Sequence, residues 1–179
     1  FLLKKRLKRS IKKNYEKELE ITKLFSNKSK FAVDVGVYRG VYSYKLSKEF
    51  KHVYSFEPNP VLFSYLDKNL TKIVKNMTIF NYALSDENKN VLLKVPKRNK
   101  SLFKENYEEI YKLGCATIHK KNNFKYFDEF KVKSKLLDDI LKNSDIGFII
   151  EQLIKYGLDG IIISNTTKSR AFAFKSRNI

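Results

Sequence analysis

Short apolar runs alternate with amphipathic stretches in the first half of the chain. Residues 31–35, 52–57 and 77–83 each have the length and composition of a buried strand. Between them, residues 41–50 and 60–73 have the apolar spacing of helices. This order predicts an α/β domain in which a mostly parallel sheet carries helices on both faces through right-handed crossovers.

The second predicted helix has the clearest start. Asn59 is a favourable N-cap, and Pro60 fits the first turn because a backbone N–H there would have no partner within the helix. We expect one face of this helix to pack on the sheet. Its apolar residues are Val61, Leu62, Tyr65, Leu66 and Leu70.

The second half of the chain is less regular. Its predicted elements are strands at residues 91–95, 146–150 and 160–164, and short helices at residues 135–142 and 151–156. A basic loop at 96–101 and a polar, aromatic stretch at 101–130 are typical of an insertion over the sheet, where substrates are usually met. We expect the last fifteen residues to be frayed.

Residues 1–30 differ from the rest in charge. They carry 11 Lys or Arg against 3 Glu, a net charge of +8 in a chain whose net charge is +18. Apolar residues recur four apart, which predicts a basic amphipathic leading helix: Leu3, Leu7, Ile11, Tyr15 and Leu19. We favour a helix packed on the domain. Contact with an anionic membrane surface or a polyanion, and a disordered arm, are the alternatives.

Composition limits the class of protein. With 179 residues, 42% of them apolar, the chain can form one domain with a substantial core. The single Cys115 cannot form an internal disulfide, which fits a reducing, cytoplasmic setting, and it is expected to be a buried apolar residue. No apolar run approaches the ~20 residues of a membrane span. Two His and one Cys, far apart in sequence, predict no metal site. Because the sequence begins with Phe1 rather than Met, a fragment of a longer chain is one interpretation.

The first predicted strand ends in a turn with two glycines, Gly36 and Gly40, close after Asp34. Glycine lets the backbone turn tightly and approach a ligand closely. A dinucleotide site has a further glycine between these two, against the pyrophosphate, whereas this chain has Tyr38 there. The turn therefore favours a ligand without phosphates over NAD, although an ordinary strand-to-helix turn could use the same glycines.

Polar residues also end the next two strands. Glu57 lies 23 residues after Asp34, and a carboxylate at that point can accept both hydroxyl hydrogens of a ribose. Asn81 and Ala83 close the third strand, where an amide and backbone groups can contact an adenine edge. Each residue alone has a structural interpretation, such as an N-capping acid or a plain strand exit. Together they predict an adenosine-binding cleft, because ligands bind beyond the carboxyl ends of parallel strands.

Five segments carry a family resemblance: Ala32-Val-Asp-Val-Gly-Val-Tyr-Arg-Gly40, Phe56-Glu-Pro-Asn-Pro60, Asn81-Tyr-Ala-Leu-Ser-Asp86, Gly114-Cys-Ala-Thr117 and Val132-Lys-Ser-Lys-Leu-Leu-Asp-Asp139. In order and spacing, residues 31–149 resemble the FkbM family of S-adenosylmethionine-dependent methyltransferases. The resemblance implies a Rossmann-like methyltransferase fold and methylation of hydroxyl groups on sugars or small natural products. It also implies the cofactor contacts: Asp34, Gly36 and Gly40 at the methionine end, Glu57 on the ribose hydroxyls, and Asn81 and Ala83 near the adenine.

The resemblance stops near Ile149. Where the family continues with acidic residues at the mouth of the fourth strand, this chain has Ile150-Glu-Gln-Leu. Residues 156–170 instead resemble dihydroorotate dehydrogenases, in which the Asn-Thr-Thr segment, here Asn165 to Thr167, contacts the pyrimidine close to the flavin. About 25 residues of a barrel of roughly 250 cannot build a flavin site alone. We interpret residues 150–179 as a foreign tail that replaces the end of the methyltransferase fold; a divergent tail is the alternative.

The sequence thus predicts an S-adenosylmethionine-dependent methyltransferase whose acceptor is a sugar or small-molecule hydroxyl. An inactive truncated or fused fragment, and a basic nucleic-acid or membrane-surface binding module, are the alternatives. No catalytic base is identified. His52 and His119 are the only histidines. His52 is expected to be structural or to face solvent, while His119 lies in the insertion and could face the acceptor.

Overall fold

Alternating strands and helices build the first half of the protein, as the apolar pattern predicts. The structure is a computed structural model that describes residues 2–13, 18–97, 111–119 and 122–141. The core elements in chain order are β1 (Asn27–Val35), α3 (Val41–Glu49), β2 (Phe50–Phe56), α4 (Pro60–Asn69) and β3 (Met77–Phe80). The fold is α/β and is compatible with a Rossmann-like fold.

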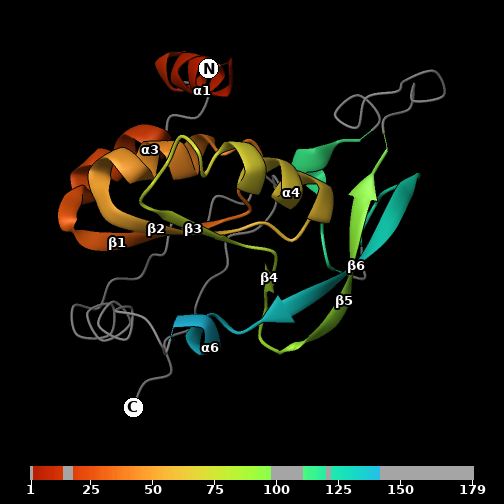
Figure 1. The fold of residues 1–179 in the computed structure, drawn as a ribbon. Helices are drawn as coiled ribbons and strands as arrows, with labels where there is room; N and C mark the ends of the chain where they lie inside the picture. The colour runs from red at the N-terminus through yellow and green to blue at the C-terminus, as the bar shows by residue number, and fades with distance from the viewer. Residues whose placement is uncertain (1, 14–17, 98–110, 120–121, 142–179) are drawn as a thin grey trace.

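Strands β1, β2 and β3 form one parallel sheet in that order. Val35 of β1 is level with Phe56 of β2, which is level with Phe80 of β3. Figure 1 shows α3 and α4 on the same side of these strands. This is the arrangement that right-handed crossovers produce when successive strands are added in one direction. Helices on the other face stay a prediction.

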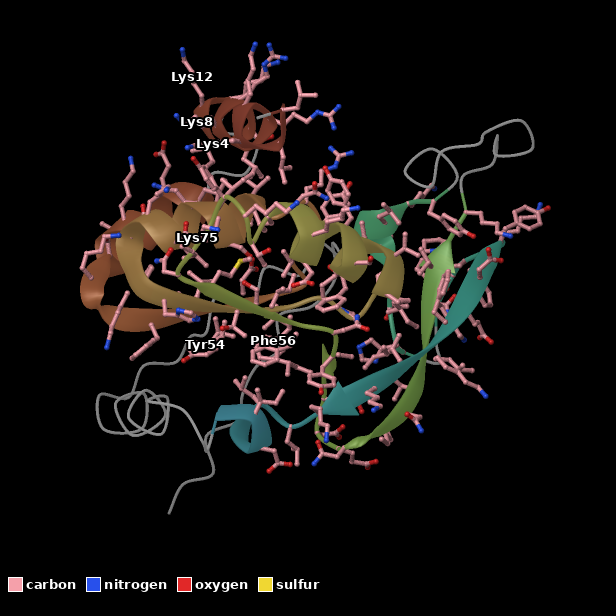
Figure 2. The ribbon with its side chains drawn as sticks, in the orientation of Figure 1. Lys4, Lys8, Lys12, Tyr54, Phe56 and Lys75 are labelled. Carbon is pink, nitrogen blue, oxygen red and sulfur yellow. The ribbon has the colours of Figure 1, made fainter. Side chains whose placement is uncertain are left out.

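The face of the sheet away from α3 and α4 is aromatic. Phe31 lies 6.1 Å from Tyr54 between ring centroids, and Phe56 stacks on Phe80 at 5.1 Å. Figure 2 shows Tyr54 and Phe56 on this side. The opposite face carries Ser55, whose hydroxyl meets Ser43 of α3.

A second, mixed sheet follows, and the sequence predicted it only in part. It has the order β4 (Ala83–Leu84), β6 (Phe127–Lys135), β5 (Lys89–Pro96), with β4 parallel and β5 antiparallel to β6. The expected single strand over residues 77–83 is therefore wrong, because the chain leaves the first sheet after Phe80. Strand β6 was not predicted, because its alternating aromatic and charged residues are typical of an irregular surface segment. It forms a strand because β5 pairs with it. The helix expected at 135–142 is confirmed as α6 (Leu137–Leu141).

Helix α4 packs through a narrower face than expected. Leu62, Leu66 and Leu70 are buried, but Val61 and Tyr65 are 41% and 46% exposed. The helix also ends at Asn69 rather than near Ile73. The reason for the narrower face is geometric: residues at i, i+4 and i+8 already form one stripe against the sheet, and Val61 and Tyr65 lie beside it.

The leading segment is divided into several elements. Helix α1 (Leu2–Lys12) is followed by α2 (Glu18–Ile21) and the 3-10 turn η1 (Thr22–Phe25), and β1 begins at Asn27. Leu7 is 2% exposed within the core, and Leu3 and Ile11 pack against that core. Helix α1 lies against α3, outside the sheet and its helices (Figure 1). This is the position expected for a leading helix that packs on the domain.

Several predictions fall outside the described residues. They are the strands at 146–150 and 160–164, the helix at 151–156, the junction near Ile149 and the tail at 150–179. The division of the chain at residues 30 and 149 likewise stays a prediction. Among the helices that the structure describes, none has the length and apolar character needed to cross a membrane.

Truncation of Leu66 tests the packing of α4. Leu66 is fully buried, so Leu66→Ala should lower the free energy of unfolding by about 2–5 kcal/mol. Val61→Ala, on the exposed side of the same helix, should change it by less than about 0.5 kcal/mol. Urea denaturation of both variants provides the measurement, and equal effects would contradict this orientation of α4.

Candidate functional site

The three loops that follow β1, β2 and β3 begin together at one edge of the sheet. The N–H groups of Gly36 and Val37 both donate to the carbonyl oxygen of Phe56, at 2.8 and 3.3 Å. The N–H of Glu57 donates to the carbonyl of Phe80 at 2.9 Å. The hydrogen bonds between the strands thus continue for one residue beyond the strand ends. They bring the predicted glycine turn beside Glu57, the predicted acid.

The glycine turn depends on left-handed backbone angles. Gly36 has φ +85°, Tyr38 +50° and Gly40 +76°. Gly40 is also the N-cap of α3, and a Cβ added to it would lie 2.6 Å from Cδ2 of Leu70. The left-handed φ and the close contact with Leu70 therefore explain why position 40 is a glycine. A structural role in the turn is sufficient for this residue, and no ligand contact is needed to account for it.

Glu57 is the centre of the site. One carboxylate oxygen accepts the N–H of Tyr38 at 2.9 Å, and the other accepts the N–H of Asn59 at 2.9 Å. The residue is only 5% exposed. Burial raises the pKa of Glu57 to about 7; its two backbone hydrogen bonds oppose this rise, and the charge of Asp34 adds to it. Glu57 thus joins the glycine turn to the start of α4.

Asn81 joins the third loop to the same point. Its side-chain amide donates to the carbonyl oxygens of Glu57 at 2.8 Å and Pro58 at 3.2 Å. Ala83, two residues later, is buried and begins β4, where it pairs with Ser134. The structure therefore brings Gly36, Glu57 and Asn81 to one edge of the sheet, and it places Ala83 at the start of the second sheet.

Asp34 lies deeper than the other predicted residues. It is 1% exposed, and its carboxylate accepts the hydroxyl of Ser43 on α3. The Ser43 hydroxyl is in turn 2.9 Å from the hydroxyl of Ser55 on β2. This buried polar row holds α3 against β1 and β2. Asp34 contributes to the site by raising the pKa of Glu57 through its charge.

Sequence reasoning missed the backbone partners of Glu57. The N–H of Tyr38 was not predicted to donate, because the left-handed φ that directs it toward Glu57 is set by the folded turn. Asn59 was predicted only as a helix cap. Its side-chain oxygen does accept from Val61 and Leu62, which confirms the cap, while its own N–H binds Glu57 two residues earlier. The Glu-Pro-Asn-Pro spacing was the available signal.

The histidines do not join this site through any described contact. His52 Nε2 lies 2.9 Å from the hydroxyl of Thr78 in the middle of the sheet, and burial lowers its pKa. His119 is exposed. In the described part of the chain, no three His, Cys, Asp or Glu side chains gather into a possible metal site. An open hollow of about 610 Å³ lies on the outer side of α4, where Val61, Tyr65 and Lys68 line it.

No known protein family matches the sequence, and no curated protein matches it significantly.

The buried carboxylate of Glu57 predicts a pH-dependent stability. Its pKa is about 7 when folded against 4.5 unfolded, so the folded state binds the proton more tightly. The free energy of unfolding should therefore fall as pH rises from about 4.5 to 7, by on the order of 3 kcal/mol from this group. Urea denaturation across this range measures the fall.

A variant isolates this contribution. Glu57→Gln should remove its part of the slope, whereas Glu129→Gln, whose side chain is 41% exposed, should keep it. His52 adds a slope of the opposite sign, because its folded pKa is lowered, but it does so in all three proteins. An unchanged slope in Glu57→Gln would contradict the burial of a titrating Glu57.

Gly40→Ala tests the close contact between the turn and α4. The left-handed φ and the contact with Leu70 should together lower stability by about 1–3 kcal/mol. In a Leu70→Ala background the same substitution should be less harmful, because the clashing atom is gone. Thermal unfolding of the four proteins in this double-mutant cycle measures the difference, and fully additive effects would contradict the contact.

Proposed function

We propose that residues 31–149 form an S-adenosylmethionine-dependent methyltransferase domain that acts on a hydroxyl group of a sugar or small metabolite. One observation carries the proposal. Glu57, at the carboxyl end of β2, contacts the glycine turn through its carboxylate and Asn81 through its carbonyl. A glycine turn and an acid at the carboxyl ends of neighbouring parallel strands are the groups that hold a nucleoside in such folds, and Asn81 adds an amide that can contact the adenine.

The donor and acceptor chemistry of the site fits this cofactor. Each oxygen of Glu57 accepts one backbone N–H, and a carboxylate oxygen has a second lone pair that can accept a ribose hydroxyl. The neighbouring acids Asp34 and Glu57 favour a cationic sulfonium over a pyrophosphate. Tyr38 occupies the position where a dinucleotide site has a glycine.

In this proposal the residues have distinct roles. Glu57 holds the ribose hydroxyls, Asn81 and Ala83 lie near the adenine, and Asp34, Gly36 and Gly40 line the methionine end. The bound cofactor supplies a methyl group on a sulfonium, which is already a good leaving group. The protein has mainly to align the acceptor with that methyl, and such alignment can contribute ~7–11 kcal/mol to the rate. Among the described residues, none is assigned as the catalytic base.

Titration calorimetry with S-adenosylhomocysteine tests the cofactor site. At a pH above 7, where the Glu57 carboxylate is ionised, Glu57→Gln should weaken binding at least about tenfold, because it removes charge-assisted hydrogen bonds to the ribose. Glu129→Gln, an equal change at an exposed position of β6, should bind as the unmodified protein does. Addition of NAD should produce no thermal shift. Unchanged affinity in a folded Glu57→Gln variant, or a clear shift with NAD, would overturn the assignment.

Methyl transfer to a panel of sugars and hydroxylated small molecules then separates an active enzyme from an inactive fragment. Transfer to one acceptor class would support the enzyme. Tight binding of S-adenosylhomocysteine without transfer to any acceptor would favour the inactive alternative, in which the foreign tail after Ile149 has removed the acidic mouth of the fourth strand.

A further inference from the structure

Helix α1 carries a dense positive charge on the outside of the protein. Six of its residues are basic and none is acidic. All six are exposed: Lys4, Lys5, Arg6, Lys8, Arg9 and Lys12. Lys4, Lys8 and Lys12 are spaced four apart and therefore share one side of the helix. Figure 2 shows these three side chains along one flank of α1.

The apolar side of α1 already has a partner. Leu7 is buried, and Leu3 and Ile11 pack against the same core. Helix α1 cannot turn this side toward another surface without leaving the domain. Whatever contacts α1 from outside therefore meets its cations. Close packing of six like charges is unfavourable in the free protein, and an anionic partner would relieve that repulsion.

We propose that α1 adsorbs the protein onto an anionic lipid bilayer, with the helix lying along the membrane surface. Clustered Lys and Arg are attracted to the negative potential of such bilayers. Leu2, at the end of α1, is 72% exposed beside these cations and can enter the headgroup region. The proposal does not depend on methyl transfer.

Nucleic acid fits this surface less well. Helix α1 has no Asn or Gln to contact adenine edges and no aromatic residue on which bases could stack, so only its Lys and Arg side chains are suited to contact bases. A phosphate backbone would also leave Leu2 without an apolar environment. Figure 1 shows α1 as a single helix on the outside of the molecule, where a bilayer surface can meet it.

Vesicle co-sedimentation tests the proposal with the full chain. The probes are vesicles of phosphatidylcholine, with and without about one-third phosphatidylserine, a content that sets the surface potential. We expect binding only to the anionic vesicles, and weaker binding as salt is raised. Lys4→Glu/Lys8→Glu/Lys12→Glu should reduce affinity at least about a hundredfold, and Leu2→Asp roughly tenfold.

A matched variant controls for net charge. Lys72→Glu/Lys131→Glu/Lys133→Glu makes the same change in charge at exposed lysines in the turn after α4 and on β6, and it should keep most of the affinity. Thermal unfolding and binding of S-adenosylhomocysteine should be unchanged in the Lys4→Glu/Lys8→Glu/Lys12→Glu variant. The vesicle test therefore does not depend on whether the proposed methyltransferase function is correct.

Three outcomes would overturn the proposal. Equal losses in the two triple variants would show that total charge, not α1, governs binding. Binding to neutral vesicles as strong as to anionic ones would exclude electrostatic adsorption. Duplex DNA or RNA bound more tightly than anionic vesicles at the same salt, through the same three lysines, would identify a nucleic-acid surface instead.

Discussion

The carboxylate of Glu57 organises the edge of the parallel sheet. It accepts backbone N–H groups from Tyr38 and Asn59, which lie in loops that follow two different strands. Without this carboxylate, the N–H groups of Tyr38 and Asn59 would lose this acceptor. Each buried donor left without a hydrogen bond typically lowers the free energy of unfolding by about 1–3 kcal/mol. Because Asn81 also binds the backbone of Glu57, all three loops at this edge depend on one short segment.

This arrangement has an energetic consequence of its own. A carboxylate that is 5% exposed is poorly solvated, and burial raises the pKa of Glu57 to about 7 despite its two hydrogen bonds. Buried acids with shifted pKa values are found both in structural networks and in ligand sites. Here the acid lies at the carboxyl edge of a parallel sheet, the place where ligands bind in such folds. This position and the raised pKa of Glu57 support the cofactor site that we propose.

The outer elements belong to the same core as the sheet. Leu7 of α1, Leu66 of α4 and Leu93 of β5 are all members of one buried cluster. The leading helix and the second sheet are therefore packed parts of the fold and not appendages. Packing of its apolar side fixes α1 in place and leaves its cations outward, so the same contact that stabilises the helix also creates the basic surface.

Local pattern was enough to determine β2, α3, the start of α4 and residues 31–35 of β1, because buried strands, helical spacing and the Asn59 cap are properties of neighbouring residues. It did not show that β1 begins at Asn27. Tertiary structure decided the rest. Strand β6 exists because β5 lies beside it, the chain leaves the first sheet after Phe80 to pair with β6, and Asp34 faces Ser43 because α3 packs there. At the site, sequence located Gly36, Glu57 and Asn81, but only folding joined them. The hydrogen bonds that join these loops run from Tyr38 to Glu57 and from Asn81 to Glu57, 19 and 24 positions apart, and their geometry depends on strand register and on a left-handed turn.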